Sequence, residues 1–154
     1  MDVTIVMFPP TRVAVISHIG DPSQEHATAR KLIAWKIENR LLDPVAHRSY
    51  GLHHTDPRYV EPYRHRVDFC LSHDGPVAAN PYGISEMTIP GMKCALARDV
   101  GSRTNNQAAQ YLHDQWLPAS GERLSGYPLI FHYVNVGPNV AAHEAITDVY
   151  MPIL

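Results

Sequence analysis

The chain has 154 residues, of which 45% are hydrophobic and 18% are charged, and its formal net charge is -2 at pH 7. A chain of this length can bury about two-thirds of the surface that it exposes when unfolded, which is enough for one stable domain. No run of basic residues could neutralise phosphates, so we expect no direct binding of nucleic acid. No segment approaches the roughly 20 consecutive apolar residues of a membrane span, and the N-terminus lacks the basic start of a signal peptide. We therefore expect a cytoplasmic protein with no membrane partner.

The first half of the chain contains apolar segments bounded by proline and glycine. Residues 3–8 predict a strand that stops at two prolines, which have no N–H group to donate to a sheet. Asp21 or Ser23 is suited to cap a helix that runs from about Gln24 to Leu42. Apolar residues and turn signals predict further strands at residues 12–20, 48–54 and 66–72.

The second half repeats this order after a connector rich in glycine, proline and asparagine at residues 73–84. Residues 85–101 predict two short strands with a break at Pro90 and Gly91. Thr104 or Asn105 is suited to cap a helix that runs to about Trp116. The closing strands are expected at residues 128–136 and 146–154.

Landmark residues recur when the numbering is shifted by 81, which indicates an internal duplication. The matching pairs are Gly20 with Gly101, Trp35 with Trp116, Tyr50 with Phe131, Pro57 with Pro138 and, after one deletion, Asp68 with Asp148. The pattern predicts an α+β fold of two pseudo-symmetric strand-helix-strand-strand repeats. Their antiparallel curved sheet would carry both helices on one face, with a central groove between them. We expect one domain over residues 1–154, with repeat one at about 1–72, the connector at 73–84 and repeat two at 85–154.

The chain resembles the GyrI-like small-molecule-binding domain, which is also the effector-binding module of some AraC-type regulators and of multidrug-sensing activators. The resemblance rests on "PPTRVAVISHIGDP", "LIAWKIENRLL" and "YGLHHTDPRYVEPYRHRVDFCL" in the first half, and on "IPGMKCALARDVG", "LHDQWLPASGERLSGYP" and "TDVYMPI" in the second. It implies a duplicated fold whose central groove binds hydrophobic, often cationic, molecules. Because the chain starts at its first strand, we expect a stand-alone version without a DNA-binding region.

The chain departs from the family at one motif. Members that bind cationic drugs commonly carry Pro-x-Phe-Glu-x-Tyr after helix two, and here Phe131 of Pro128–Tyr133 stands where the glutamate would be. A buried carboxylate attracts a cation strongly, whereas a phenyl ring offers apolar area and a cation–π face of about 0.5–2 kcal/mol. We therefore expect weaker selection for cations, and less support for the hydrolase activity that the resemblance allows.

Aromatic side chains are the main candidates for a ligand site, because an aromatic slot binds flat apolar molecules by contact area and stacking. We expect walls and margins formed by Trp35, Tyr50, His54, Trp116, Phe131, Tyr133 and Tyr150. The two tryptophans also fit a purely structural role in the core. The acids Glu38, Asp68 and Asp148 are candidates for the charge that Phe131 lacks, and each also fits a structural or solvated role.

Metal binding and covalent catalysis have little support in the sequence. His53 and His54 are adjacent on a strand, so they point to opposite faces and cannot easily hold one ion together. His54 shares its face with Tyr50, which places it at the groove end and turns His53 away. Cys70 and Cys94 read as small buried hydrophobes. We expect no catalytic residue, no metal and no cofactor.

The leading hypothesis is non-enzymatic binding of a small hydrophobic or amphipathic molecule, which could be cationic, between the two repeats. One alternative is an interaction protein that acts on a macromolecular partner such as DNA gyrase or a regulator. A second alternative is a hydrolase of reactive small molecules.

Overall fold

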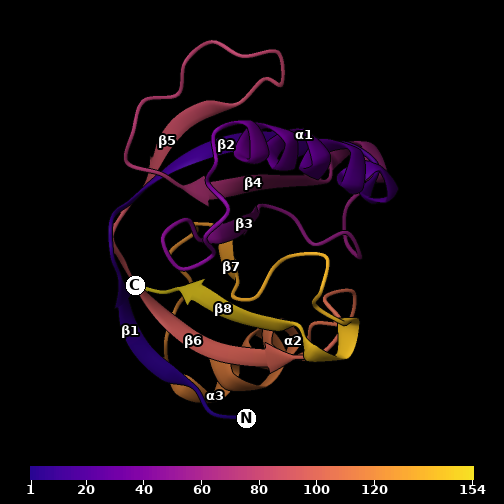
Figure 1. Ribbon diagram of the computed structural model, residues 1–154. Helices are drawn as coiled ribbons and strands as arrows, with labels where there is room; N and C mark the ends of the chain where they lie inside the picture. Colours follow the sequence, from indigo (N-terminus) through magenta and orange to yellow (C-terminus); the bar gives the residue numbers. More distant parts are fainter.

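The computed structural model describes all 154 residues as one antiparallel sheet of eight strands, curled into a half-barrel, with two helices (Figure 1). The strands are β1 (Thr4–Phe8), β2 (Thr11–Ile19), β3 (Ser49–His53), β4 (Arg66–Ser72), β5 (Ser85–Ile89), β6 (Met92–Val100), β7 (Leu129–Tyr133) and β8 (Ile146–Pro152). The first helix is α1 (Glu25–Glu38), and the second consists of α2 (Gln107–Tyr111), the π-helical turn η3 (Leu112–Trp116) and α3 (Leu117–Ser120). Short 3-10 turns lie at η1 (Pro22–Gln24), η2 (Pro62–Arg64) and η4 (Ala142–Glu144). The predicted α+β class and duplicated order are confirmed.

The sheet is symmetric about its central pair of strands. Its order is β1-β6-β8-β7-β3-β4-β2-β5, so each strand of one repeat has its counterpart on the other side of the β3–β7 contact. The leading strands are exchanged: β1 of repeat one pairs with β6 of repeat two, and β5 of repeat two pairs with β2 of repeat one. The sequence pattern predicts these strands but not their exchange. That residues 1–154 act as a single domain remains our proposal, which one cooperative unfolding transition would test.

The spacing of the duplication differs from the predicted one within the central strands. Gly20 and Gly101 are 81 residues apart and occupy matching turns, as predicted. In β3 and β7, however, equivalent residues are 80 apart, because Gly51 and Phe131 face each other at the centre of the pseudo-two-fold. The predicted match of Tyr50 with Phe131 is therefore wrong by one position. The spacing between the repeats therefore shortens from 81 to 80 before β3, and not after it as predicted. A shift of one residue in a strand moves every side chain to the other face.

Both helices differ from the prediction at their ends. Helix α1 stops at Glu38 instead of Leu42, where Arg40 adopts a left-handed backbone with φ 58°. Asp21 caps the preceding turn η1 by accepting a hydrogen bond from the Ser23 N–H. The second helix is capped by Asn106 and runs past Trp116 to Ser120. No helix is long and apolar enough to span a bilayer.

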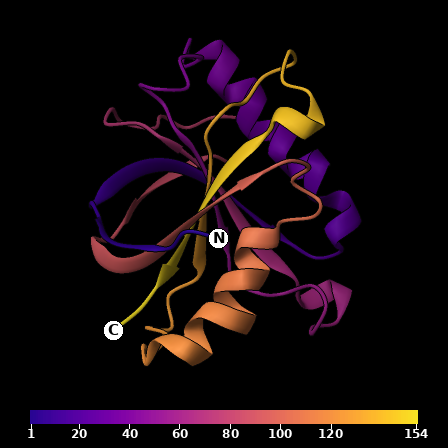
Figure 2. The same cartoon turned by 90° about the horizontal axis from the view of Figure 1, so that it is seen from below.

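Both helices pack on one face of the sheet, here called the helix face (Figure 2). Leu32 and Trp35 of α1 pack on Ala14 and Leu71 of repeat one. A matching core in repeat two joins Ala108, Leu112, Val149 and their neighbours. The opposite face has its own core, formed by Phe8, Val13, Val15, Tyr50, Leu52, Cys70, Ile89, Cys94 and Ile130. The predicted placement of the helices is confirmed, as is the burial of Cys70 and Cys94.

Candidate functional site

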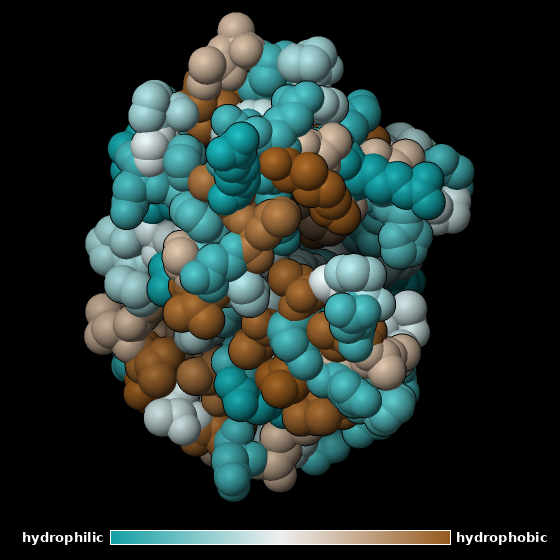
Figure 3. Space-filling model, viewed as in Figure 1, coloured by the Kyte–Doolittle hydropathy of each residue, from teal (hydrophilic) through white to brown (hydrophobic).

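A large cavity, of about 680 Å³, lies on the helix face beside α1. Its walls come from Leu32, Ile33 and Ile37 of α1, from β4, and from the loop after β7. The 16 lining residues are Ala29, Leu32, Ile33, Lys36, Ile37, Leu42, Ser49, Tyr50, Phe69, Cys70, Leu71, Arg103, Tyr133, Val136, Gly137 and Pro138, of which 11 are hydrophobic. In the space-filling view, hydrophobic residues gather around a hollow below α1 (Figure 3). Both repeats contribute, so the cavity spans the seam but belongs mainly to repeat one.

A smaller cavity, of about 250 Å³, is the symmetry counterpart of the large one. Leu129, Met151 and His53 line it, and each is 80 residues from Ser49, Leu71 or Tyr133 of the large cavity. Three histidines and few apolar side chains line it, namely His53, His54 and His113 beside Leu124, Gly126, Tyr127, Pro128, Leu129 and Met151. The duplication has therefore produced two cavities, and only one of them is both roomy and apolar.

The partition between the two cavities lies at the centre of the pseudo-two-fold. The Phe131 ring lies over His53, with ring centroids 3.9 Å apart, and the Tyr133 hydroxyl is 3.3 Å from His53 Nε2. A side chain on Gly51 would enter this contact, since an added Cβ would lie 2.5 Å from the Tyr133 hydroxyl. Glycine at position 51 thus makes room for Tyr133, which borders the large cavity.

Two cationic side chains border the large cavity, and no acidic side chain does. Lys36 comes from α1, and burial lowers its pKa. Arg103 comes from the loop before α2, where its guanidinium lies 5.3 Å from the centre of the Tyr133 ring. Burial also lowers the pKa of Arg103 and raises that of Tyr133. The cavity is therefore apolar with a positive local charge.

The predicted wall residues are divided between the two faces of the sheet. Phe131 and Tyr133 lie on the helix face, as predicted, but only Tyr133 borders the large cavity. Tyr50 borders the cavity, but its ring packs on the opposite face, 5.8 Å from the Phe8 ring. Tyr150 also packs on Phe8, at 5.1 Å. The one-residue slip in the repeat explains this error, because it assigned Tyr50 the face of Phe131.

His53, the last residue of β3, and His54, which follows it, exchange their predicted positions. His53, expected to face away, stacks on Phe131 on the helix face. His54, expected at the groove end, has its Nε2 2.8 Å from Asp68 Oδ2 and borders only the small cavity. His54 does share its face with Tyr50, as predicted, but that face is the one without helices.

The two tryptophans pack against the sheet. Trp35 is 4% exposed, and its ring meets His73 edge-on at 5.7 Å. Trp116 is partly buried and packs against the repeat-two core that contains Leu112. Neither borders a cavity described above, which favours their structural role.

None of the three candidate acids borders the large cavity. Glu38 accepts a hydrogen bond from the Tyr82 hydroxyl at 2.7 Å. Asp148 accepts two hydrogen bonds from Arg98, at 2.7 and 3.0 Å. Asp68 is buried, which acts to raise its pKa, but hydrogen bonds from Ser17, Arg66 and His54 outweigh burial and hold the pKa below its ordinary value. These carboxylates are engaged in structural contacts.

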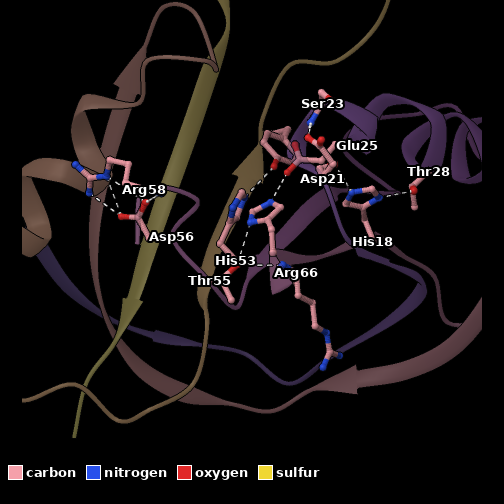
Figure 4. Close-up of polar contacts among 12 residues, drawn as sticks. His18, Asp21, Ser23, Glu25, Thr28, His53, Thr55, Asp56, Arg58 and Arg66 are labelled. Carbon is pink, nitrogen blue, oxygen red and sulfur yellow. Dashed lines mark hydrogen bonds and ion pairs between the residues drawn. The ribbon is translucent and has the colours of Figure 1, made fainter. Parts of the chain in front are cut away.

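A polar cluster joins the start of α1 to the loop after β3 (Figure 4). His65 is almost fully buried, and it bonds Glu25 of α1 through Nε2 and Thr55 through Nδ1, the latter at 2.9 Å. No group of three or more His, Cys, Asp or Glu side chains has the geometry to hold a metal ion. The histidine-rich segment 51–66 therefore supplies structural contacts at this end of the helix.

His53 is expected to make the fold sensitive to acid. Burial lowers its pKa from 6.5 to about 4, with a further contribution from the nearby His65 and His54. Between these pH values the unfolded chain binds a proton at His53 that the folded protein does not, so stability falls as pH drops from 6.5 towards 4. We expect His53→Gln to reduce the loss of unfolding free energy between pH 7 and pH 4.5 by about 1–2 kcal/mol. Urea titrations at both pH values measure this difference.

His26→Gln, on the exposed surface of α1, is the control for this prediction. An equal change of unfolding free energy with pH in both variants would contradict it.

Most of the cavity wall was not predicted from the sequence. Ile33 and Ile37 are 49% and 55% exposed and lie one helical turn apart, beside the buried Leu32 and Trp35. The sequence did carry a signal for these two residues, because the apolar stripe of this helix is wider than its contact with the core requires. Arg103 gives no such signal, because only the fold brings its loop onto Tyr133.

The family model of the GyrI-like small molecule binding domain matches residues 1–154, the whole chain. This protein belongs to the GyrI-like family. A relative, the "Probable transcriptional regulator YgiV" of Escherichia coli K12, is 33% identical over 154 residues, covering 99% of this chain and 96% of the relative.

Two proteins of known structure have the same fold at lower identity. The EcmrR C-terminal domain matches with a TM-score of 0.76 and 18% identity, over 99% of this chain and 97% of that domain. In the structure of EcmrR bound to DNA, the match spans 57% of the EcmrR chain, so this GyrI-like chain corresponds to little more than half of it. SAV2435 bound to tetraphenylphosphonium matches with a TM-score of 0.60 and 12% identity, over 100% of this chain and 94% of SAV2435.

Proposed function

We propose that this GyrI-like protein binds a small apolar molecule in the large cavity between α1, β4 and the loop after β7. The observation that carries the proposal is the cavity itself, whose 680 Å³ and largely hydrophobic lining fit the range of small-molecule sites. Apolar area removed from water contributes about 25 cal/mol per Å² and supplies the driving force.

The relatives support this proposal. The family is described as a small molecule binding domain, and SAV2435 was solved with tetraphenylphosphonium bound. The relative in Escherichia coli is named a probable transcriptional regulator. We therefore propose that the bound molecule acts as an effector, and that binding requires no covalent chemistry.

A binding experiment with one wall variant tests the proposal. We expect calorimetry with a panel of aromatic and alicyclic molecules to find micromolar or tighter binding. We expect Ile37→Gln to weaken that binding about tenfold, because it replaces an apolar wall by an amide that the ligand desolvates. Ile37 is 55% exposed, so the substitution should leave the fold intact.

Val45→Gln is the matched control, since Val45 is also apolar and exposed but lies outside the cavity. The proposal fails if no member of the panel binds below high micromolar concentrations. It also fails if Ile37→Gln and Val45→Gln bind the ligand equally well.

A further inference from the structure

The charges around the large cavity all have one sign. Lys36 and Arg103 are its only charged lining residues. The two carboxylates of α1 turn elsewhere: Glu25 bonds His65, and Glu38 bonds Tyr82. Neither Lys36 nor Arg103 forms an ion pair, although five other lysine or arginine side chains do so with a carboxylate. Both cations therefore face the cavity without a counter-charge.

Arg103 is held in place by neutral acceptors. Its Nη2 donates to the Asn135 carbonyl at 2.7 Å and to the Ile146 carbonyl at 3.2 Å, and its Nε donates to the Thr147 hydroxyl at 3.3 Å. Its Nη1 has no hydrogen-bond partner within the chain. The guanidinium is thus fixed against the Tyr133 ring, with one donor group still available. An oriented donor of this kind loses little conformational freedom when an acceptor arrives.

The positive charge is not a by-product of the duplication. Arg103 follows β6, and the position 81 residues earlier, after β2, is Pro22. The counterpart of Tyr133 is His53, which the lowered pKa of about 4 keeps neutral near pH 7. Only the roomy, apolar cavity has acquired a pair of cations.

We infer that the large cavity selects small apolar molecules that carry an anionic group, such as a carboxylate, over molecules of the same shape that carry a positive charge. The inference rests on the proposed binding function and specifies the class of ligand. Burying an unpaired charge is unfavourable, so Lys36 and Arg103 gain from an anion that arrives with its own apolar body. A lipophilic cation would meet the positive charges of Lys36 and Arg103 and no carboxylate. Because these two charges are partly buried, they would repel the cation more strongly than they would in water.

Tetraphenylborate and tetraphenylphosphonium form a matched pair of probes, since they have nearly the same shape and opposite charge. We expect calorimetry at 50 mM salt and pH 7 to find at least about tenfold tighter binding of the borate. We expect Lys36→Met to remove most of this preference, mainly by weakening the borate. Arg103→Met should act in the same direction. Because Arg103 also ties β8 to the loop after β7, Lys36→Met is the primary variant, and thermal unfolding checks the fold of both.

Lys31→Met is the control, because Lys31 lies on the exposed surface of the same helix and outside the cavity. It should retain the preference for borate, which excludes an effect of net charge alone. Tighter or equal binding of the phosphonium would overturn the inference while leaving the proposed function intact. A preference that survives Lys36→Met unchanged would also overturn it. Absence of binding by either probe and by the neutral panel would instead refute the proposed function.

Discussion

Replacing Trp35 by alanine is expected to lower the free energy of unfolding by about 3–5 kcal/mol, a large part of the stability of a domain of this size. Trp35 is 4% exposed and connects α1 to the sheet through Leu71, Ile16 and the edge-on contact with His73. Its removal leaves a cavity that the rigid sheet beneath cannot fill. Urea unfolding followed by far-UV circular dichroism measures the change without depending on tryptophan fluorescence. Trp35→Phe should lose less than half as much stability as Trp35→Ala.

The duplication provides the control for this experiment. Trp116 is the counterpart of Trp35 but is only partly buried, so Trp116→Ala should cost about 1–2 kcal/mol. The comparison also tests the role of both rings. If Trp35→Phe abolished ligand binding while the fold remained stable, Trp35 would belong to the site, and our structural interpretation of it would be wrong.

Replacing Gly51 by alanine is expected to cost about 1–3 kcal/mol, although the change adds one methyl group. The backbone at Gly51 is ordinary extended strand, so the cost arises from contact alone. The added Cβ would lie 2.5 Å from the Tyr133 hydroxyl and 3.2 Å from His53 Nε2. Tyr133 cannot move away freely, because Arg103 lies over its ring and His53 bonds its hydroxyl. We also expect weaker ligand binding, since the displaced ring would enter the large cavity.

A double variant identifies the atom responsible. Tyr133→Phe removes the hydroxyl and leaves the nearest Tyr133 atom 3.2 Å from the new Cβ. In the Gly51→Ala/Tyr133→Phe protein, the combined loss of stability should be smaller than the sum of the two single losses by about 1 kcal/mol or more. Additive losses in the urea titrations would show that the contact between position 51 and Tyr133 is not the cause.

Much of the fold was predictable because local patterns and tertiary structure agree. Strand β4 was predicted at the residues that form it, since apolar residues and flanking turns mark both of its ends. Gly20 and Gly101 lie at φ 131° and 136°, a region that favours glycine, so their recurrence marked the duplication. The exchange of β1 and β5 could not be predicted from local sequence. A short apolar strand has the same pattern of alternating residues whether it pairs within its own repeat or with the other one.

The candidate site was harder to predict for a specific reason. A duplication is recognised by landmarks, but its spacing can change by one residue at any loop. Assigning the deletion after Tyr50 instead of before it placed Tyr50 and His54 on the helix face, although Tyr50 packs on Phe8 and His54 on Asp68. Phe131 and Tyr133 were correctly placed together on one face of their strand, because alternation within one strand needs no alignment. The positive charge of the cavity depends on Arg103, whose position only the tertiary structure specifies.

The exchange of leading strands means that half of this chain would be incomplete by itself. Without β5, the outer edge of β2 would have no partner, and the same holds for β6 without β1. Open edges of this kind pair with another chain. A half-length protein would therefore complete its sheet only as a dimer of two identical halves that lend each other a strand, with a stability that depends on concentration. Joining the halves through residues 73–84 makes that association intramolecular. It also allows the two cavities related by the pseudo-two-fold to differ, so that one is roomy and positively charged and the other is not.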